Sequence, residues 1–171
     1  VEGVRIAARA LPVAVKDGHD LAARSDMLMS SMMGAIAFQK DLGAVHSCAH
    51  ALSTVLDMHH GLANGIMIDH VMRFNLPAAT TKMAELAHVA GVSGTGAMSE
   101  QEAAVAFIAW LAKMKADLGI PATLSAMTAQ RPVTRADIPA LVDVAINDTC
   151  HKTNPRPCKR ADFERMFTDA I

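Results

Sequence analysis

Histidine is concentrated in one short part of the sequence. The chain contains eight histidines, and five of them lie between His46 and His70. His46 and His50 are four residues apart, so a helix would place both imidazoles on one face. Two neutral imidazoles on one face can bind a transition metal such as Fe, Zn, Ni or Cu, or contact one substrate molecule. These histidines are therefore the first candidate functional site.

A third histidine, His60, can join this pair only if the helix between them is broken. In one unbroken helix, the fourteen-residue separation of His46 and His60 would hold them about 21 Å apart. The segment 57–59 is the predicted break, and Gly61 is expected to supply the backbone freedom for a tight turn. We therefore expect the chain to fold back and bring the side chains of His46 and His60 within about 5 Å of each other.

Spacing alone leaves three interpretations of the histidine cluster open: metal binding, a structural role, and acid–base chemistry without a metal. Two histidines do not complete a metal site, since a catalytic metal has three or more protein ligands. Asp57 and Asp69 are carboxylates close to the cluster in the sequence. Neither has a spacing that compels its choice as a further ligand.

Composition and charge exclude several classes of partner. The chain has 171 residues, of which 51% are hydrophobic and 19% charged, and its formal net charge is −1. Such a chain can form a sizeable core, but it offers no electrostatic reason to bind nucleic acid or an anionic membrane. No apolar run approaches the roughly 18 residues of a transmembrane helix. The three cysteines form no CxxC pair, which speaks against a disulfide framework and fits a reducing cytoplasm.

The spacing of apolar residues predicts an all-α, bundle-like fold of about seven to nine helices. No βαβ pattern is present, a capping box at Ser99–Glu102 marks one helix start, and Pro77 and Gly119 mark helix ends. We expect the Met-rich helix over 21–39 to be buried, because apolar residues lie on most of its sides. The expected helices cover 3–10, 21–39, 44–56, 62–74, 80–90, 100–118, 134–147 and 160–168.

The histidine motif and its flanking residues resemble a known family. Gly43-x-x-His46-x-x-x-His50 is followed ten residues later by His60-Gly61, and then by the segment His70–Asn75. Together with Ala37-Phe38 upstream and Thr153–Pro157 downstream, this pattern resembles the iron-dependent alcohol dehydrogenase family. The resemblance covers nearly the whole chain.

The resemblance implies how the chain relates to a longer protein. The family has an N-terminal α/β domain that binds NAD(P) and a C-terminal all-helical domain that holds the metal, with a fold similar to that of dehydroquinate synthase. Residues 1–171 would form a single all-helical metal-binding domain. The nucleotide-binding domain and the first part of the helical domain are then absent from this chain, and NAD or NADP would bind through the missing domain.

The resemblance also implies roles for individual residues. His46 and His60 match two metal ligands, for Fe²⁺ or alternatively Zn²⁺, and the other two ligands are expected on an Asp-x3-His helix upstream of this chain. His50 matches a catalytic histidine that relays the proton of the alcohol. Ala51 and Ser53 replace a usual Pro and Gly, a departure that bears on substrate specificity more than on metal binding.

The function implied for the full-length protein is the interconversion of an alcohol and an aldehyde or ketone with NAD(P). We expect a cytoplasmic homo-oligomer that takes a small alcohol or aldehyde, with neither nucleic acid nor a membrane as partner, and an inactive isolated chain. The alternative is a non-catalytic helical interaction or regulatory module, since two ligands and the cofactor domain are missing. A metal-dependent hydrolase is a further alternative, although Asp69-His70 has the wrong order for a His-Asp ligand pair.

Overall fold

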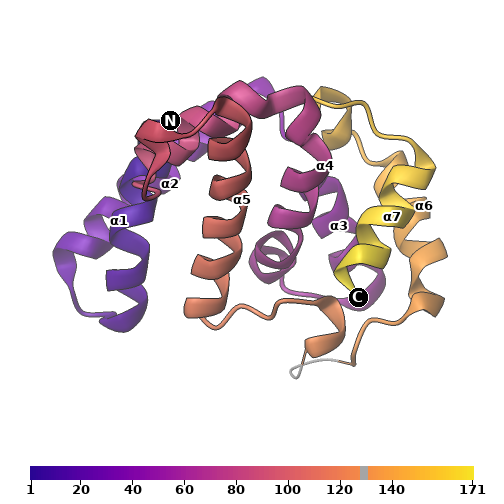
Figure 1. Cartoon of the computed structure of the whole chain (residues 1–171). Helices are drawn as coiled ribbons and strands as arrows, with labels where there is room; N and C mark the ends of the chain where they lie inside the picture. Colours follow the sequence, from indigo (N-terminus) through magenta and orange to yellow (C-terminus); the bar gives the residue numbers. More distant parts are fainter. Residues whose placement is uncertain (128–130) are drawn as a thin grey trace. The chain divides into compact units, whose positions relative to one another are not determined.

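The computed structural model describes residues 1–127 and 131–171, and all of its regular secondary structure within those ranges is helical (Figure 1). The prediction of an all-α fold is confirmed. No helix in the described ranges is long and apolar enough to cross a membrane. The α-helices are α1 (Glu2–Lys16), α2 (Leu21–Ala37), α3 (Ala44–Leu56), α4 (His60–Val89), α5 (Glu100–Asp117), α6 (Ile138–Asn147) and α7 (Arg160–Ala170). Short 3-10 helices are η1 (Phe38–Lys40), η2 (Thr95–Ala97), η3 (Leu124–Ala126), η4 (Arg135–Asp137) and η5 (Cys150–Thr153).

The described chain divides into two compact units, which we call unit 1 and unit 2. Unit 1 comprises Val1–Lys40 and Ala79–Leu111, and unit 2 comprises Asp41–Ala78 and Ala112–Ile171. Unit 1 therefore contains α1, α2 and most of α5, whereas unit 2 contains α3, α6, α7 and the first part of α4.

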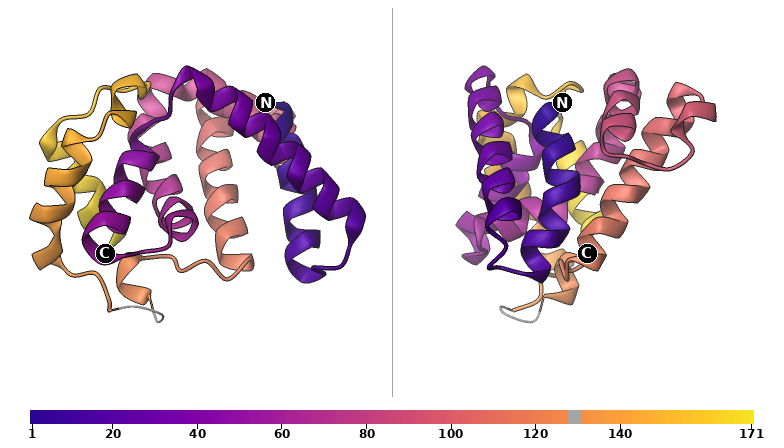
Figure 2. Two further views of the ribbon diagram at one scale, coloured as in Figure 1. Left: turned by 180° about the vertical axis from the view of Figure 1, so that it is seen from behind. Right: turned by 90° about the vertical axis from the view of Figure 1, so that its left-hand side faces the viewer.

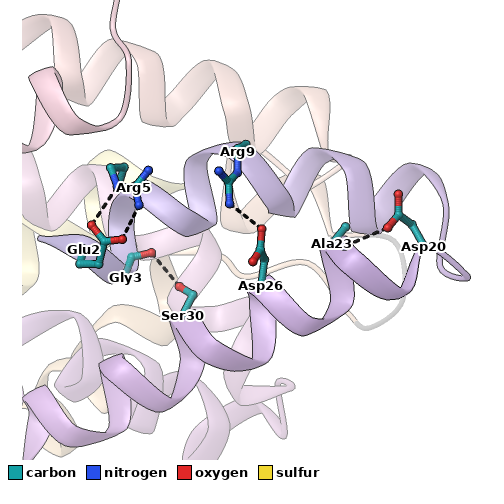
Figure 3. Close-up of polar contacts among 8 residues, drawn as sticks. All are labelled: Glu2, Gly3, Arg5, Arg9, Asp20, Ala23, Asp26 and Ser30. Atoms are coloured by element: carbon teal, nitrogen blue, oxygen red, sulfur yellow. Dashed lines mark hydrogen bonds and ion pairs between the residues drawn. The ribbon is translucent and has the colours of Figure 1, made fainter.

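In unit 1, α1 and α2 form an antiparallel hairpin (Figure 2). Asp20 caps the start of α2 by accepting a 2.9 Å hydrogen bond from the backbone N–H of Ala23. The hydroxyl of Ser30 donates to the carbonyl of Gly3 at 2.7 Å, and Arg9 pairs with Asp26 further along the hairpin (Figure 3). These contacts fix the register of the two helices.

The expectation that the helix over 21–39 is buried is wrong. Ala23 is the buried residue of α2, whereas Leu21, Leu28 and Ile36 leave 76%, 74% and 64% of their surface exposed. The apolar pattern shows which faces of a helix favour burial, but not whether another element covers them. In this structure α1 packs along α2 and leaves those side chains uncovered.

Two prolines lie inside helices rather than at their ends, in contrast to the prediction. Pro12 lies within α1, which continues to Lys16. Pro77 lies within α4, and the helical backbone breaks only at Ala79, where φ is −137° and ψ is 21°. A proline removes one backbone donor and crowds the preceding turn, yet it leaves the next residues free to continue the helix. The predicted helices over 62–74 and 80–90 are therefore the two halves of a kinked α4.

The core of unit 2 forms where α3 packs against α6 and α6 against α7 (Figure 1). Its largest fully buried side chains include those of Leu52, Leu141 and Phe163. A buried ion pair joins Asp69 of α4 to Lys115 of α5, and Lys115 also donates to the carbonyl of Ile66 at 2.7 Å. Burial opposes ionisation of Asp69, but hydrogen bonds from Lys115 and Arg73 outweigh it and lower the pKa of this carboxyl group.

The predicted capping signals are confirmed by the contacts they make. The backbone N–H of Ser99 donates to the carboxylate of Glu102 at 2.8 Å, and the Glu102 N–H returns a bond to the Ser99 hydroxyl at 3.3 Å. Thr134 and Asp137 form a second capping box. Gly119, with φ of +77°, follows the end of α5.

Candidate metal centre

The corner between α3 and α4 brings the predicted site together. α3 ends at Leu56, Asp57 adopts the left-handed conformation with φ of 53°, and α4 begins at His60. Aspartate tolerates this region better than most side chains. The hydroxyl of Ser53 donates to the carbonyl of Met58 at 2.9 Å and holds the turn. The predicted break between His46 and His60 is therefore present.

Gly61 does not supply the tight turn, contrary to the prediction. The left-handed residue is Asp57, and Gly61 lies inside the first turn of α4. A Cβ atom at Gly61 would lie 3.2 Å from the Cε1 atom of His59, so the glycine makes room for that ring. His59 Nδ1 in turn accepts a 3.4 Å hydrogen bond from the Leu62 N–H near the start of α4. His59 therefore has a capping role.

Three imidazoles meet at this corner. The ring centroids of His46 and His60 are 5.5 Å apart, those of His50 and His60 are 5.2 Å apart, and those of His46 and His50 are 6.1 Å apart. His46 and His50 project from one face of α3, and His60 is the first residue of α4. His46 and His50 are half-buried and His60 is exposed, so the cluster is open to solvent on one side.

The environment of His46 favours its neutral form. Burial lowers the pKa of His46, and the neighbouring His60 and His50 lower it further, against a smaller opposing effect of Asp148. A neutral imidazole is the form that can donate a lone pair to a metal.

His60 is oriented by Asn64 one turn further along α4. The side-chain amide of Asn64 donates to the backbone carbonyl of His60 at 3.0 Å and lies 2.9 Å from the His60 Nε2 atom. With this orientation of the amide, Nε2 is the acceptor, and its single lone pair is engaged in this bond. A cation bound through Nε2 would therefore replace the hydrogen bond from Asn64.

Asp148 is the residue of the site that sequence reasoning missed. It lies between α6 and η5, and its Oδ2 atom is 2.8 Å from Nδ1 of His50. Its Oδ1 atom accepts 2.8 Å hydrogen bonds from the Ser47 hydroxyl and the Cys150 N–H. Burial opposes ionisation of Asp148, but these hydrogen bonds outweigh it and lower its pKa. No local spacing could reveal this partner, because 98 residues separate it from His50.

Cys150 completes a second group of donors beside the imidazoles. Among the described residues, the donor atoms of His50, Asp148 and Cys150 lie within 4.8 Å of one another. Burial and the adjacent Asp148 carboxylate raise the pKa of the Cys150 thiol to about 11, so the thiol is neutral at pH 7. All three cysteines are free thiols, which agrees with the predicted lack of a disulfide framework. Asp69, considered from the sequence as a ligand, is committed to its ion pair with Lys115.

A family profile and two known proteins match this chain over its full length. The sequence profile described as "Fe-containing alcohol dehydrogenase family, C-terminal" matches residues 1–171. The 1,3-propanediol dehydrogenase of Citrobacter freundii is 35% identical over 172 residues, which cover 100% of this chain and 43% of that protein. The NAD-dependent methanol dehydrogenase of Bacillus methanolicus is 31% identical over 172 residues, with 100% and 44% covered.

The fold is also that of solved relatives. A crystal structure of 1,3-propanediol oxidoreductase superimposes with a TM-score of 0.92 and 34% sequence identity, over 99% of this chain and 44% of that one. The chain therefore spans less than half the length of the relatives it matches.

Proposed function

Because the chain belongs to the Fe-containing alcohol dehydrogenase family, we propose that it is the all-helical metal-binding domain of an enzyme that interconverts an alcohol and an aldehyde or ketone with NAD(P). The observation that carries the proposal is the convergence of His46, His50 and His60 at the α3–α4 corner. NAD(P) binding and two further ligands, an Asp and a His, would come from the part of the full-length protein that this chain does not span. The full-length protein would be a cytoplasmic homo-oligomer acting on a small alcohol or aldehyde.

His46 and His60 are the residues of this chain that would hold the metal. Their donor chemistry fits Fe²⁺, with Zn²⁺ as the alternative, since both are nitrogen donors and His46 is held in its neutral form. When bound, the metal would supply Lewis-acid polarisation of the substrate oxygen, and NAD(P) would supply the hydride acceptor. The exposed side of the cluster leaves room for the missing ligands and the substrate.

His50 would act on the proton rather than on the metal. Its Nδ1 atom is engaged with Asp148, so Nε2 is the atom that can take the hydroxyl proton of the alcohol. In the oxidative direction His50 would take the hydroxyl proton of the alcohol, and accepting the hydride is the chemistry that NAD(P)⁺ would supply. The reverse reaction returns both, which is the behaviour of a general acid–base residue.

The proposal is tested in the full-length protein with two histidine variants. His60→Ala should abolish metal retention, because a metal ligand is lost. His50→Ala should retain the metal but lower turnover, and the exposed His88→Ala is the matched control that should change neither. Metal analysis and alcohol-dependent NAD(P)H formation provide the two readouts.

Two outcomes would contradict the assignment. Loss of metal in His50→Ala as complete as in His60→Ala would overturn the division of roles. A wild-type full-length protein that neither retains metal nor forms NAD(P)H would favour the non-catalytic interaction module. The 171-residue chain alone should bind metal weakly and oxidise no alcohol, since part of the ligand set is missing.

A further inference from the structure

Asp148 uses its two carboxylate oxygens differently. Oδ1 accepts two hydrogen bonds, from the Ser47 hydroxyl and from the Cys150 backbone N–H, both at 2.8 Å. Oδ2 faces the Nδ1 atom of His50 at 2.8 Å. Rotating the carboxylate would break both bonds to Oδ1, so Oδ2 is held against the imidazole.

The segment that carries Asp148 is itself anchored to the start of α3. The Thr153 hydroxyl donates to the carbonyl of Leu42 at 2.7 Å, and Asn154 Oδ1 accepts from the Ala44 N–H at 3.2 Å. A Cβ atom at Gly43 would lie 3.2 Å from that Asn154 oxygen, so the glycine permits the close approach. These contacts, together with the hydrogen bond from Ser47 to Asp148, hold Asp148 close to α3.

This arrangement dictates where the proton of His50 lies. An ionised carboxylate has no hydrogen to donate, so the proton in the bond between Asp148 and His50 must belong to Nδ1. The Nε2 atom of neutral His50 is then left as a lone-pair acceptor. Such a carboxylate fixes both the tautomer and the ring orientation of its histidine.

We propose that Asp148 is the positioning residue of the site, which fixes His50 in the Nδ1–H tautomer and aims its Nε2 atom at the reacting proton. The proton-relay part of this inference rests on the proposed function, whereas the tautomer can be measured without it. Asp148 acts through His50 and does not itself exchange a proton with the substrate.

Asp148→Asn gives a sharp test because the fixed donors dictate how the amide is oriented. The backbone N–H of Cys150 can only donate and needs an acceptor at the Oδ1 position, so the amide oxygen lies there and the NH₂ group faces His50. The amide then donates to Nδ1, which reverses the bond and moves the proton of His50 to Nε2. The expected result in the metal-free 171-residue chain is a tautomer switch of His50, read by ¹⁵N NMR of labelled histidine.

The full-length protein provides a second readout. Asp148→Asn should lower kcat by about 10- to 100-fold, with KM and metal content little changed, as expected for loss of a residue that orients a functional histidine. Asp143→Asn is the matched control, because Asp143 lies on α6 and forms an exposed ion pair with Arg160. It should leave the His50 tautomer, kcat and metal content unchanged.

Asp148→Ala keeps the test decisive if Asp148→Asn does not fold. Removing the carboxylate leaves the Nδ1 atom of His50 without its acceptor, so we expect a mixture of the two His50 tautomers. An unchanged Nδ1–H tautomer in both variants, or a kcat within twofold of wild type in Asp148→Asn, would overturn the proposal.

The same three donors could instead form a cation site, and the experiment separates the two cases. Co²⁺ added to the 171-residue chain would then give a thiolate-to-cobalt absorption band that Cys150→Ser abolishes. If Asp148→Asn also abolished the band, Asp148 would be a ligand and its positioning role would be overturned. Absence of the band, together with the tautomer switch, supports the proposal. If His60→Ala retained metal while Asp148→Asn still switched the tautomer, the proposed metal site would fail and the positioning role would stand.

Discussion

The α1–α2 hairpin and the α3–α4 corner are both pairs of helices joined by a short turn, yet they differ in burial. α3 buries six residues, including Ser47, Cys48 and Leu52, whereas α2 buries Ala23. The difference lies in what packs against each pair, since α6 and η5 cover α3 while α1 packs along α2. Apolar composition is thus not sufficient to form a core, which also requires partners from elsewhere in the chain.

The same comparison shows which of the two regions can hold functional side chains in a fixed geometry. At the corner, side chains from distant segments hold the imidazoles by buried or half-buried contacts, such as those of Ser47 with Asp148. In the hairpin the ion pair of Arg9 with Asp26 is solvent-exposed, although the hydrogen bond from Ser30 to Gly3 is partly buried. Exposed ion pairs contribute little to stability, so Arg9 and Asp26 add little to the stability of the hairpin.

The largest expected difference between the two regions is the contribution of their ion pairs to stability. Lys115→Met should destabilise the chain by about 3 kcal/mol, because Asp69 would stay buried with Arg73 as its remaining charged partner. Arg9→Met in the hairpin should change stability by less than about 1 kcal/mol. Urea denaturation followed by far-UV circular dichroism measures both, and equal changes would remove the distinction between the two regions.

The second contrast uses one substitution at two leucines. Leu52→Ala removes a fully buried side chain of α3 and should destabilise the chain by about 2–5 kcal/mol through lost burial and a cavity. Leu28→Ala removes a side chain that is 74% exposed and should change stability by no more than about 0.5 kcal/mol. The same denaturation experiment tests the pair, and a large effect at Leu28 would mean that another element covers α2 in solution.

The smallest contrast concerns two helical glycines. Gly34→Ala on α2 should stabilise the chain by about 0.5–1 kcal/mol, because alanine favours the helix and the added Cβ would meet no atom within 4 Å apart from its chain neighbours and the backbone of its own helix. Gly65→Ala on α4 should bring no such gain, since its Cβ would lie 3.3 Å from Ile120 Cδ1. Thermal unfolding midpoints compare the two variants, and a gain at Gly65 equal to that at Gly34 would show that Ile120 yields freely.

The features that could be predicted from the sequence are those that depend on residues close together in the chain. The Ser99–Glu102 box follows from capping chemistry. The break between His46 and His60 follows from the condition that the two imidazoles can share an ion only if the helix ends between them, whereas the residue that turns the chain is Asp57 and not the predicted Gly61. Pro77 shows the limit of such rules, since a proline destabilises a helix without dictating the residue at which the backbone bends. The bend occurs at Ala79 instead.

Features that depend on distant partners could not be predicted. The burial of α2 failed as a prediction because periodicity cannot reveal which faces are covered. Asp148 gave no signal because its partners Ser47 and His50 lie about a hundred residues away in the chain. The family resemblance supplied the proposed roles of the histidines, whereas the contact of Asp148 with His50 became visible only in the structure.

The number of residues in the turn 57–59 determines which side of α4 faces α3. Each residue added to or removed from this turn would rotate the start of α4 by about 100° about its axis. The ring of His60 would then point away from His46 and His50, although every side chain of the cluster would still be present. A single insertion or deletion at 57–59 is therefore expected to disperse the cluster more completely than most substitutions, and the length of this turn is under tighter constraint than its composition.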